Sequence, residues 1–297
     1  MTLEIPAEQL VFFPCDGVVL AGILTIPAEP NGQTVMIAWG GGTYPSSGRN
    51  RLRTRLARNL AEHGFHAFRF DYQGVGESHG DYRKPDMAAP NTDGVLAACT
   101  WLISQGHRRI VIVANCFGAW SALMSAPRIL GLEAMALINT PVWRDHLQAR
   151  AGVSSWRWWT ATLKNVTFSK LISTSSWAKL RRLLATKASA PARPRSGSTS
   201  FSEAIRSLLE RRIPVLLIYG DDAFYADLEV ELDLGLRATI EGAGPPTCLV
   251  KVAERLEGYA SLGSQEVILR EVVPWLLELP ESSTGGNTKS TAEMRPP

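Results

Sequence analysis

Short apolar runs along the chain alternate with stretches in which apolar residues recur every three or four positions. The first pattern is typical of buried strands and the second of amphipathic helices. The runs predict strands at 18–26, 34–38, 66–70, 109–114, 133–139, 214–219 and 247–252, and helices at 49–63, 91–104, 117–125 and 266–279. Strands that alternate with helices of this length predict an α/β protein with a mostly parallel, doubly wound sheet.

The alternation stops at Pro141, and no strand is predicted again before Pro214. We therefore interpret residues 1–142 and 213–280 as one α/β core and residues 143–212 as an inserted helical cap. The Ser, Pro and Arg-rich stretch 188–200 predicts a flexible loop within the cap. Residues 281–297 are rich in Ser, Thr, Gly and Pro and predict a disordered tail.

The composition narrows the class of protein. Hydrophobic residues make up 45% of the chain and charged residues 20%, which is ordinary for a globular protein. A net charge of +3 does not indicate a nucleic-acid partner. Basic residues and tryptophans gather in 143–212, which favours a partly solvated lid or, as the alternative, a peripheral contact with a membrane or lipid.

The first residues, the length of the apolar runs and the cysteines favour a cytoplasmic protein. The first residues lack the basic and apolar parts of a signal peptide, and no apolar run approaches the roughly 20 residues needed to span a bilayer. The four cysteines lie far apart without zinc-site spacing, so we expect free thiols and neither a metal nor another cofactor.

The candidate chemistry centres on Cys116, which follows an apolar strand and precedes a helix. A sharp strand-to-helix turn needs small residues two positions before and after its centre, and Ala114 and Gly118 satisfy this. Such a turn places the thiol at a helix N-terminus, where the helix dipole favours the nucleophilic thiolate. The alternative is that Cys116 is a small, buried apolar side chain.

A glycine run, Gly40 to Gly42, follows the strand 34–38 and predicts donors for a developing oxyanion. We expect the N–H groups of Gly41, Gly42 and Phe117 to form this oxyanion hole; the alternative for the glycines is a simple tight turn. The strand 66–70 ends at Asp71, in a loop that does not fit a dinucleotide-binding fingerprint, and Asp71 is expected to brace that loop.

Together these three stretches resemble the α/β-hydrolase superfamily over about residues 18–279. The pattern is similar to serine-aminopeptidase-like hydrolases and, among them, to exosortase A system-associated hydrolases, which carry cysteine at the same turn. That group usually has histidine where this chain has Asn50. The resemblance implies an α/β-hydrolase fold with a cap and a nucleophile at Cys116.

The resemblance also implies a triad acid after the strand 214–219, where Asp222 is the first choice and Asp221 the second. The triad histidine should follow the strand 247–252, but the chain has none after His146 and places Tyr259 at about that position. A phenol, with a pKa of about 10, is a poor base at neutral pH.

Three substitutes for the missing base are open. His79 could reach Cys116 from its loop, Glu257 or Tyr259 could act through water, or the thiol could act without a base. The sequence thus predicts an enzyme that attacks an ester, thioester or amide carbonyl of a small acyl-bearing substrate through acyl-Cys116, as a hydrolase or acyltransferase. The alternative is a catalytically degenerate relative that serves as a binding or scaffold protein.

Overall fold

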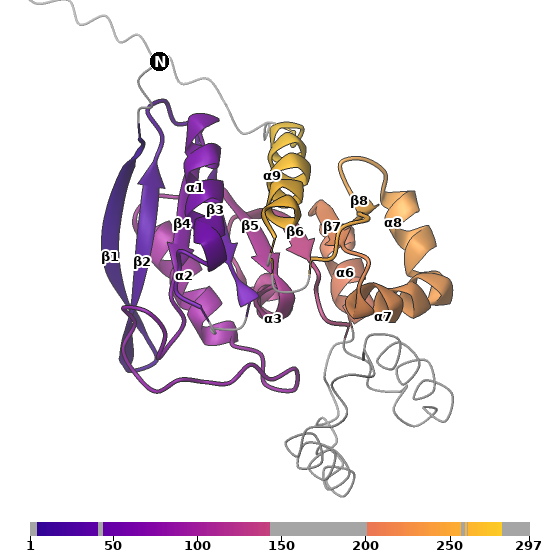
Figure 1. The fold of residues 1–297 in the computed structure, drawn as a ribbon, viewed down its shortest axis with the longest axis horizontal. Helices are drawn as coiled ribbons and strands as arrows, with labels where there is room; N and C mark the ends of the chain where they lie inside the picture. The colour runs from indigo at the N-terminus through magenta and orange to yellow at the C-terminus, as the bar shows by residue number, and fades with distance from the viewer. Residues whose placement is uncertain (1–4, 41–43, 143–200, 257–258, 260, 281–297) are drawn as a thin grey trace, which may run out of the picture.

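The computed structural model describes residues 5–40, 44–142, 201–256, 259 and 261–280. In these ranges one eight-stranded sheet runs in the order β1-β2-β4-β3-β5-β6-β7-β8 (Figure 1). The first two strands form an antiparallel hairpin, β2 is antiparallel to β4, and the pairs from β4 to β8 are parallel. The strands are β1 (Ala7–Cys15), β2 (Val18–Ile26), β3 (Thr34–Ala38), β4 (His66–Phe70), β5 (Ile110–Asn115), β6 (Leu132–Ile138), β7 (Val215–Tyr219) and β8 (Cys248–Lys251). The predicted α/β class with a mostly parallel sheet is confirmed.

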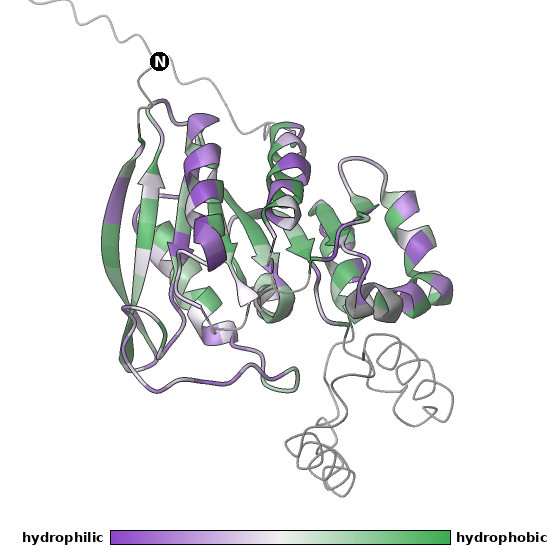
Figure 2. Ribbon diagram, in the orientation of Figure 1, coloured by the Kyte–Doolittle hydropathy of each residue, from purple (hydrophilic) through white to green (hydrophobic). Residues whose placement is uncertain are grey.

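Helices cover both faces of this sheet, so the central strands are buried on both sides. Along β3, Val35 and Ile37 face one hydrophobic cluster while Met36 and Ala38 face the other. The first cluster is closed by α1 (Leu52–Glu62) and α9 (Leu262–Leu277), and the second by α2 (Thr92–Ser104), α3 (Cys116–Ser125) and α6 (Phe201–Glu210) together with α7 (Ala223–Glu231) and α8 (Arg237–Ala243). Figure 2 shows the hydrophobic central strands and the mixed surfaces of α1 and α9. This double cover explains why the strands read as continuous apolar runs.

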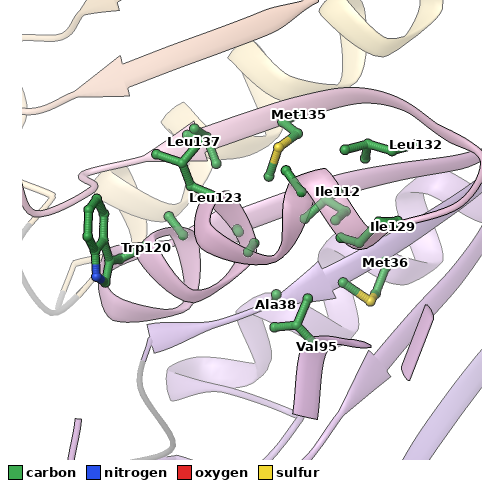
Figure 3. Close-up of a cluster of buried hydrophobic side chains, with 14 of the residues drawn as sticks. Met36, Ala38, Val95, Ile112, Trp120, Leu123, Ile129, Leu132, Met135 and Leu137 are labelled. Carbon is green, nitrogen blue, oxygen red and sulfur yellow. The ribbon is translucent and has the colours of Figure 1, made fainter. Parts of the chain in front are cut away.

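The packing of α3 matters most, because its first residue is Cys116. Trp120 and Leu123 of α3 are buried in the cluster that also contains Ile112 of β5 and Leu137 of β6 (Figure 3). Full burial of one large apolar side chain contributes about 1.5–3 kcal/mol. These contacts hold α3 on the sheet and so fix where Cys116 lies.

Two regions of regular structure are missing from the sequence prediction. Strand β1 is exposed along its first half and alternates between buried and exposed only from Val11 on, so its pattern is weak. Residues 223–243 form α7, the π-helical turn Leu232–Leu236 and α8, where no element was predicted. The signal there is a four-residue spacing of buried side chains, Leu228, Leu232, Leu236 and Ile240.

The predicted cap boundary needs a correction. Helix α6 lies within the range 143–212 assigned to the cap, yet Phe201, Ile205 and Leu208 are buried in the same cluster as α3. Its apolar face therefore belongs to the core, and the core resumes by residue 201. The rest of the predicted cap, its loop at 188–200 and the tail at 281–297 lie outside the described residues. Within the described ranges no helix has the length and apolar character to cross a membrane.

Candidate active site

The turn between β5 and α3 has the strained geometry that its sequence predicts. Asn115 is extended (φ −134°, ψ 153°), and Cys116 adopts a left-handed backbone with φ 51°, which is unusual for a residue other than glycine. A Cβ atom on Gly118 would lie 2.6 Å from the carbonyl oxygen of Ala38 and 2.7 Å from the carbonyl carbon of Trp39. Only glycine fits at position 118, because β3 passes directly against the start of α3.

Cys116 is partly exposed, in contrast to Cys15 and Cys99, which are buried. Burial raises the pKa of Cys99 to about 12 and also raises that of Cys15. Cys248 is half-buried, its pKa is raised mainly by desolvation, and it lies at the opposite edge of the sheet, at the start of β8. Cys116 therefore combines access to solvent with a place at a helix N-terminus.

The glycine run begins beside this turn. The N–H of Gly40 donates to Oδ1 of Asn115 at 2.8 Å, and a Cβ on Gly40 would lie 4.0 Å from Cβ of Cys116. Gly41 and Gly42, the predicted oxyanion donors, lie outside the described residues. Phe117 is in the first turn of α3, where a backbone N–H has no acceptor within the helix and can serve a ligand.

The predicted acid, Asp222, lies after β7 and is held by Asn139, the residue that follows β6. Nδ2 of Asn139 donates to Oδ2 of Asp222 at 2.6 Å, and its Oδ1 accepts from the N–H of Gly220 at 3.0 Å. Asp221 is exposed, and its Oδ1 lies 3.9 Å from Nζ of Lys251. These contacts favour Asp222 over Asp221 as the carboxylate of the site.

Tyr259 occupies the place after β8 where the resemblance implies a histidine. Its side chain is buried and its ring centroid lies 5.6 Å from that of Trp39. Asn115 is near the hydroxyl of Tyr259 and acts to lower the pKa of Tyr259. Within the described residues, however, the hydroxyl has no partner in ordinary hydrogen-bond geometry. Burial is the largest cause of a strongly raised pKa, and negative charge on Cys116 or Asp222 raises it further. Tyr259 is thus a neutral phenol at neutral pH and not a base.

Close packing of two loops brings Tyr259 toward Asp222. A Cβ on Gly220 would lie 2.6 Å from the carbonyl oxygen of Glu254, so the loop after β8 can approach the end of β7 only because residue 220 is glycine. The N–H of Asp221 donates to that same carbonyl at 3.2 Å. From α9, Nε2 of Gln265 donates to the backbone oxygen of Tyr259 at 3.1 Å.

His79 is not brought to Cys116, so its predicted role as a substitute base is not supported. Its side chain is exposed, and its N–H donates to the carbonyl of Val19 in β2 at 2.9 Å. Strands β4 and β3 lie between β2 and β5, so at ordinary strand spacing the distance from β2 to β5 is about 14 Å. Glu257, the other substitute, lies outside the described residues.

The other described histidines are also elsewhere. His63 is exposed and pairs with the carbonyl of Asn59. His66 and His107 lie at the amino ends of β4 and β5 with ring centroids 4.8 Å apart. Of the histidines in the described residues, none lies beside Cys116.

Asp71 braces its loop, as expected. Its Oδ1 accepts from the N–H of Ser46 and its Oδ2 from the N–H of Glu77 at 3.2 Å. Burial raises the pKa of Asp71, and these hydrogen bonds oppose that shift. Its carboxylate also lies where a Cβ on Gly76 would stand, so the loop closes around it.

Sequence reasoning missed the two asparagines that join the parts of the site. Asn115 ties the glycine run to the strained turn, and Asn139 holds Asp222. Both directly end or follow a parallel strand, which is the signal that could have found them. Within the described residues no three His, Cys, Asp or Glu side chains are grouped to hold a metal ion.

Comparison with known proteins agrees with this architecture. A sequence model described as the alpha/beta hydrolase family matches residues 35–253. No curated protein matches the sequence.

Among solved structures, an esterase from Pyrococcus furiosus is similar with a TM-score of 0.61 and 17% identity, covering 92% of each chain. An esterase domain from Rhodothermus marinus has a TM-score of 0.55 and 17% identity, covering 91% of this chain and 97% of its own. A serine hydrolase without a lid from Xanthomonas campestris has a TM-score of 0.53 and 18% identity, covering 93% and 96%. These likenesses show the fold, and the family match over most of the sequence shows that the chain belongs to the alpha/beta hydrolase family.

Proposed function

We propose that this protein is an α/β-hydrolase-type enzyme that acts on an ester, thioester or amide carbonyl through a covalent acyl-Cys116 intermediate. The observation that carries the proposal is that Cys116, at the start of α3, is partly exposed and has a left-handed backbone. A backbone strained in this way persists only where the surrounding packing imposes it, and such strain concentrates at functional sites.

In the proposed reaction the thiol first releases its proton to solvent, and the thiolate attacks the acyl carbon. We propose that the N–H of Phe117, in the first turn of α3, and those of Gly41 and Gly42 stabilise the negative charge that develops on the carbonyl oxygen. Collapse of the tetrahedral intermediate expels the leaving group and leaves a thioester at Cys116. The acyl group then passes to water, in hydrolysis, or to another nucleophile, in acyl transfer.

Two likenesses support this proposal. The similar solved structures include proteins named as esterases. The resemblance to exosortase A system-associated hydrolases, which also carry cysteine at this turn, favours a thiol nucleophile. The substrate class we propose is a small acyl-bearing molecule, and we place the protein in the cytoplasm, where the thiol of Cys116 would stay reduced. We also propose a peripheral membrane or lipid contact through the basic residues and tryptophans of the predicted cap, 143–212.

A second candidate function is a binding or scaffold protein that retains the fold without turnover. The observation that favours it is Tyr259, a buried neutral phenol at the place of the triad base. In this case a carbonyl ligand would bind near Cys116 without forming a covalent bond.

Intact-mass analysis separates the two functions. The protein is incubated with short-chain acyl thioesters and activated aryl esters, and the modified residue is located by peptide mapping. We expect one acyl group on wild type and on Cys248→Ala, and none on Cys116→Ala. Cys248 is the matched control because it is likewise partly exposed. Absence of any adduct across chain lengths would support the binding function, and an adduct that persists in Cys116→Ala would contradict acylation at Cys116.

A further inference from the structure

Tyr259 places a phenol where the resemblance implies the triad histidine, and a phenol has a different chemistry from an imidazole. The ring packs against Trp39, the hydroxyl is buried near Asn115, and negative charge on either Cys116 or Asp222 would act on it. Gln265 holds its backbone, and the close approach at Gly220 holds its loop. The phenol is therefore positioned by the fold on the side of the site where a proton would have to be accepted.

The hydroxyl can donate a hydrogen bond, but it cannot act as a base. Only the phenolate could accept a proton, and burial near Asp222 disfavours that anion. Within the described residues the hydroxyl donates to no acceptor in ordinary hydrogen-bond geometry, so we expect it to donate to an incoming group. A buried hydroxyl left without a partner costs about 1–3 kcal/mol. A ligand that accepts this hydrogen bond would recover part of that cost.

From this arrangement we propose that the site exchanges acyl groups between thiols and that Tyr259 at the place of the base keeps the acyl-enzyme from hydrolysing. The inference rests on the acyl-Cys116 intermediate of the proposed function. In the first step the Cys116 thiolate forms a bond to the acyl carbon of a thioester, the bond from that carbon to the donor sulfur breaks, and the donor leaves as a thiolate. In the second step an acceptor thiolate forms the new thioester and Cys116 leaves with its electron pair. Each step makes one thioester and breaks one, and no net proton is consumed.

The donor class follows from the leaving group. A thiol has a pKa of about 8.5, so its thiolate departs at neutral pH without being protonated. An alcohol or amine leaving group needs a proton from a general acid, which in the usual triad is the imidazolium. A neutral phenol whose pKa is strongly raised is a weaker acid than that imidazolium.

The acceptor class follows from the same comparison. A few per cent of a free thiol is already thiolate at pH 7 and needs no base. Water is a far weaker acid than a thiol and becomes an effective nucleophile only when a base removes its proton. Discharge to a thiol is therefore fast without an imidazole, whereas discharge to water is slow.

The test begins with acyl-Cys116 protein formed from a short-chain acyl thioester and freed of excess reagent. Its discharge is followed by mass spectrometry in buffer alone, with a small thiol and with an amine of similar size. We expect the thiol at millimolar concentration to discharge wild type at least 100-fold faster than buffer. Discharge in buffer that equals or exceeds discharge to the thiol would overturn the inference. If hydrolysis is fast and is lost in His146→Ala, a histidine from residues 143–200 supplies the base and the inference is likewise wrong.

A variant expected to gain hydrolysis of the acyl-enzyme provides a second test. Tyr259 has a left-handed backbone with φ 47°, a conformation in which histidine is enriched among non-glycine residues, so Tyr259→His fits the backbone. An imidazole next to Asp222 should raise the hydrolysis rate of the acyl-enzyme by about 10²–10⁴-fold, the usual contribution of a general base. Adding Asp222→Asn to Tyr259→His should remove most of that gain.

Tyr82→His is the matched control, because Tyr82 is exposed on the loop after β4 and should leave hydrolysis unchanged. A folded Tyr259→His variant that hydrolyses no faster than wild type would contradict the role of Tyr259. If that variant does not fold, the partition of the wild-type acyl-enzyme between thiol and water still decides the inference. Failure of any acyl-Cys116 to form refutes the proposed function itself, which is a different outcome from fast hydrolysis of an adduct that does form.

Discussion

The two edges of the parallel sheet differ in how their polar groups are arranged. At the amino edge, the side chains are paired with one another: Thr34 with His107, and both Gln33 and Arg109 with Glu133. At the carboxyl edge, Cys116, Asn139 and Tyr259 each have a left-handed backbone, and the hydroxyl of Tyr259 has no hydrogen bond of ordinary geometry in the described part of the chain.

The difference between the edges is the combination of strain with a hydroxyl that lacks a partner in the described residues, because strain alone also occurs at the amino edge, at Arg212 before β7. The amino-edge contacts lower the free energy of the folded state because these polar side chains satisfy one another. The carboxyl edge has strained residues and a hydroxyl left to bind something else, which is the pattern expected of a site that works on a substrate. The proposed chemistry of Cys116 and Tyr259 therefore belongs to the carboxyl edge.

The largest expected effect comes from Gly118→Ala. The new Cβ would collide with backbone atoms of Ala38 and Trp39, which cannot move without displacing β3. We expect the free energy of unfolding to fall by about 3 kcal/mol, the upper range for overpacking, and acylation of Cys116 to fall with it. Urea denaturation and the mass assay measure the two effects.

Gly242→Ala is the matched control for that change. Gly242 also lies in a helix, α8, but a Cβ there meets nothing within 4 Å. Alanine should stabilise the helix by about 1 kcal/mol relative to glycine. Equal effects of the two substitutions would show that the turn at Cys116 is not sterically constrained.

A smaller loss is expected for Asn139→Ala. The change removes the hydrogen bond to the Asp222 carboxylate and the one from Gly220, and it places alanine in a left-handed conformation. We expect a loss of about 2 kcal/mol in the free energy of unfolding. Asn59→Ala, which breaks only an exposed contact with Glu62, should change it by less than about 0.5 kcal/mol. A similar cost for both would mean that Asn139 does not hold the acid loop.

The smallest expected effect is on how stability depends on pH, through His66 and His107 at the amino edge of the sheet. Burial lowers the pKa of His66 and of His107 below the unfolded value of about 6.5. Near and below pH 6.5 the unfolded chain therefore binds more protons than the folded one, and stability falls as the pH drops toward the lowered folded pKa. Above pH 6.5 this contribution is constant.

We expect His66→Gln to make the fall in Tm between pH 7 and pH 5 shallower than in wild type, with parallel curves between pH 7 and pH 8. Thermal melts across this range measure the difference. Curves that remain parallel down to pH 5 would show that His66 is not kept neutral by the fold.

Much of the fold could be predicted from the sequence because the parallel strands are buried on both faces and read as apolar runs. The edge strand β1 was missed because half of it is exposed, and residues 223–243 because charged residues interrupt the spacing of Leu228 and its partners. Sequence reasoning located Cys116 through its small neighbours, a local steric requirement. It could not find the contacts of Asn115 and Asn139 or the distance of His79 from Cys116, because these depend on how separate loops meet in space.

The proposed function depends on an activated thiol at Cys116, at the strained turn between β5 and α3. Its most direct test is the rate of alkylation by iodoacetamide in the folded protein at pH 5 to 9, with the modified cysteine identified by peptide mass and Cys116→Ser as the blank. We expect Cys116 to react before Cys248 and, at pH 6 to 7, faster than a free cysteine in solution. A rate at Cys116 no higher than that of free cysteine in this pH range would contradict this expectation.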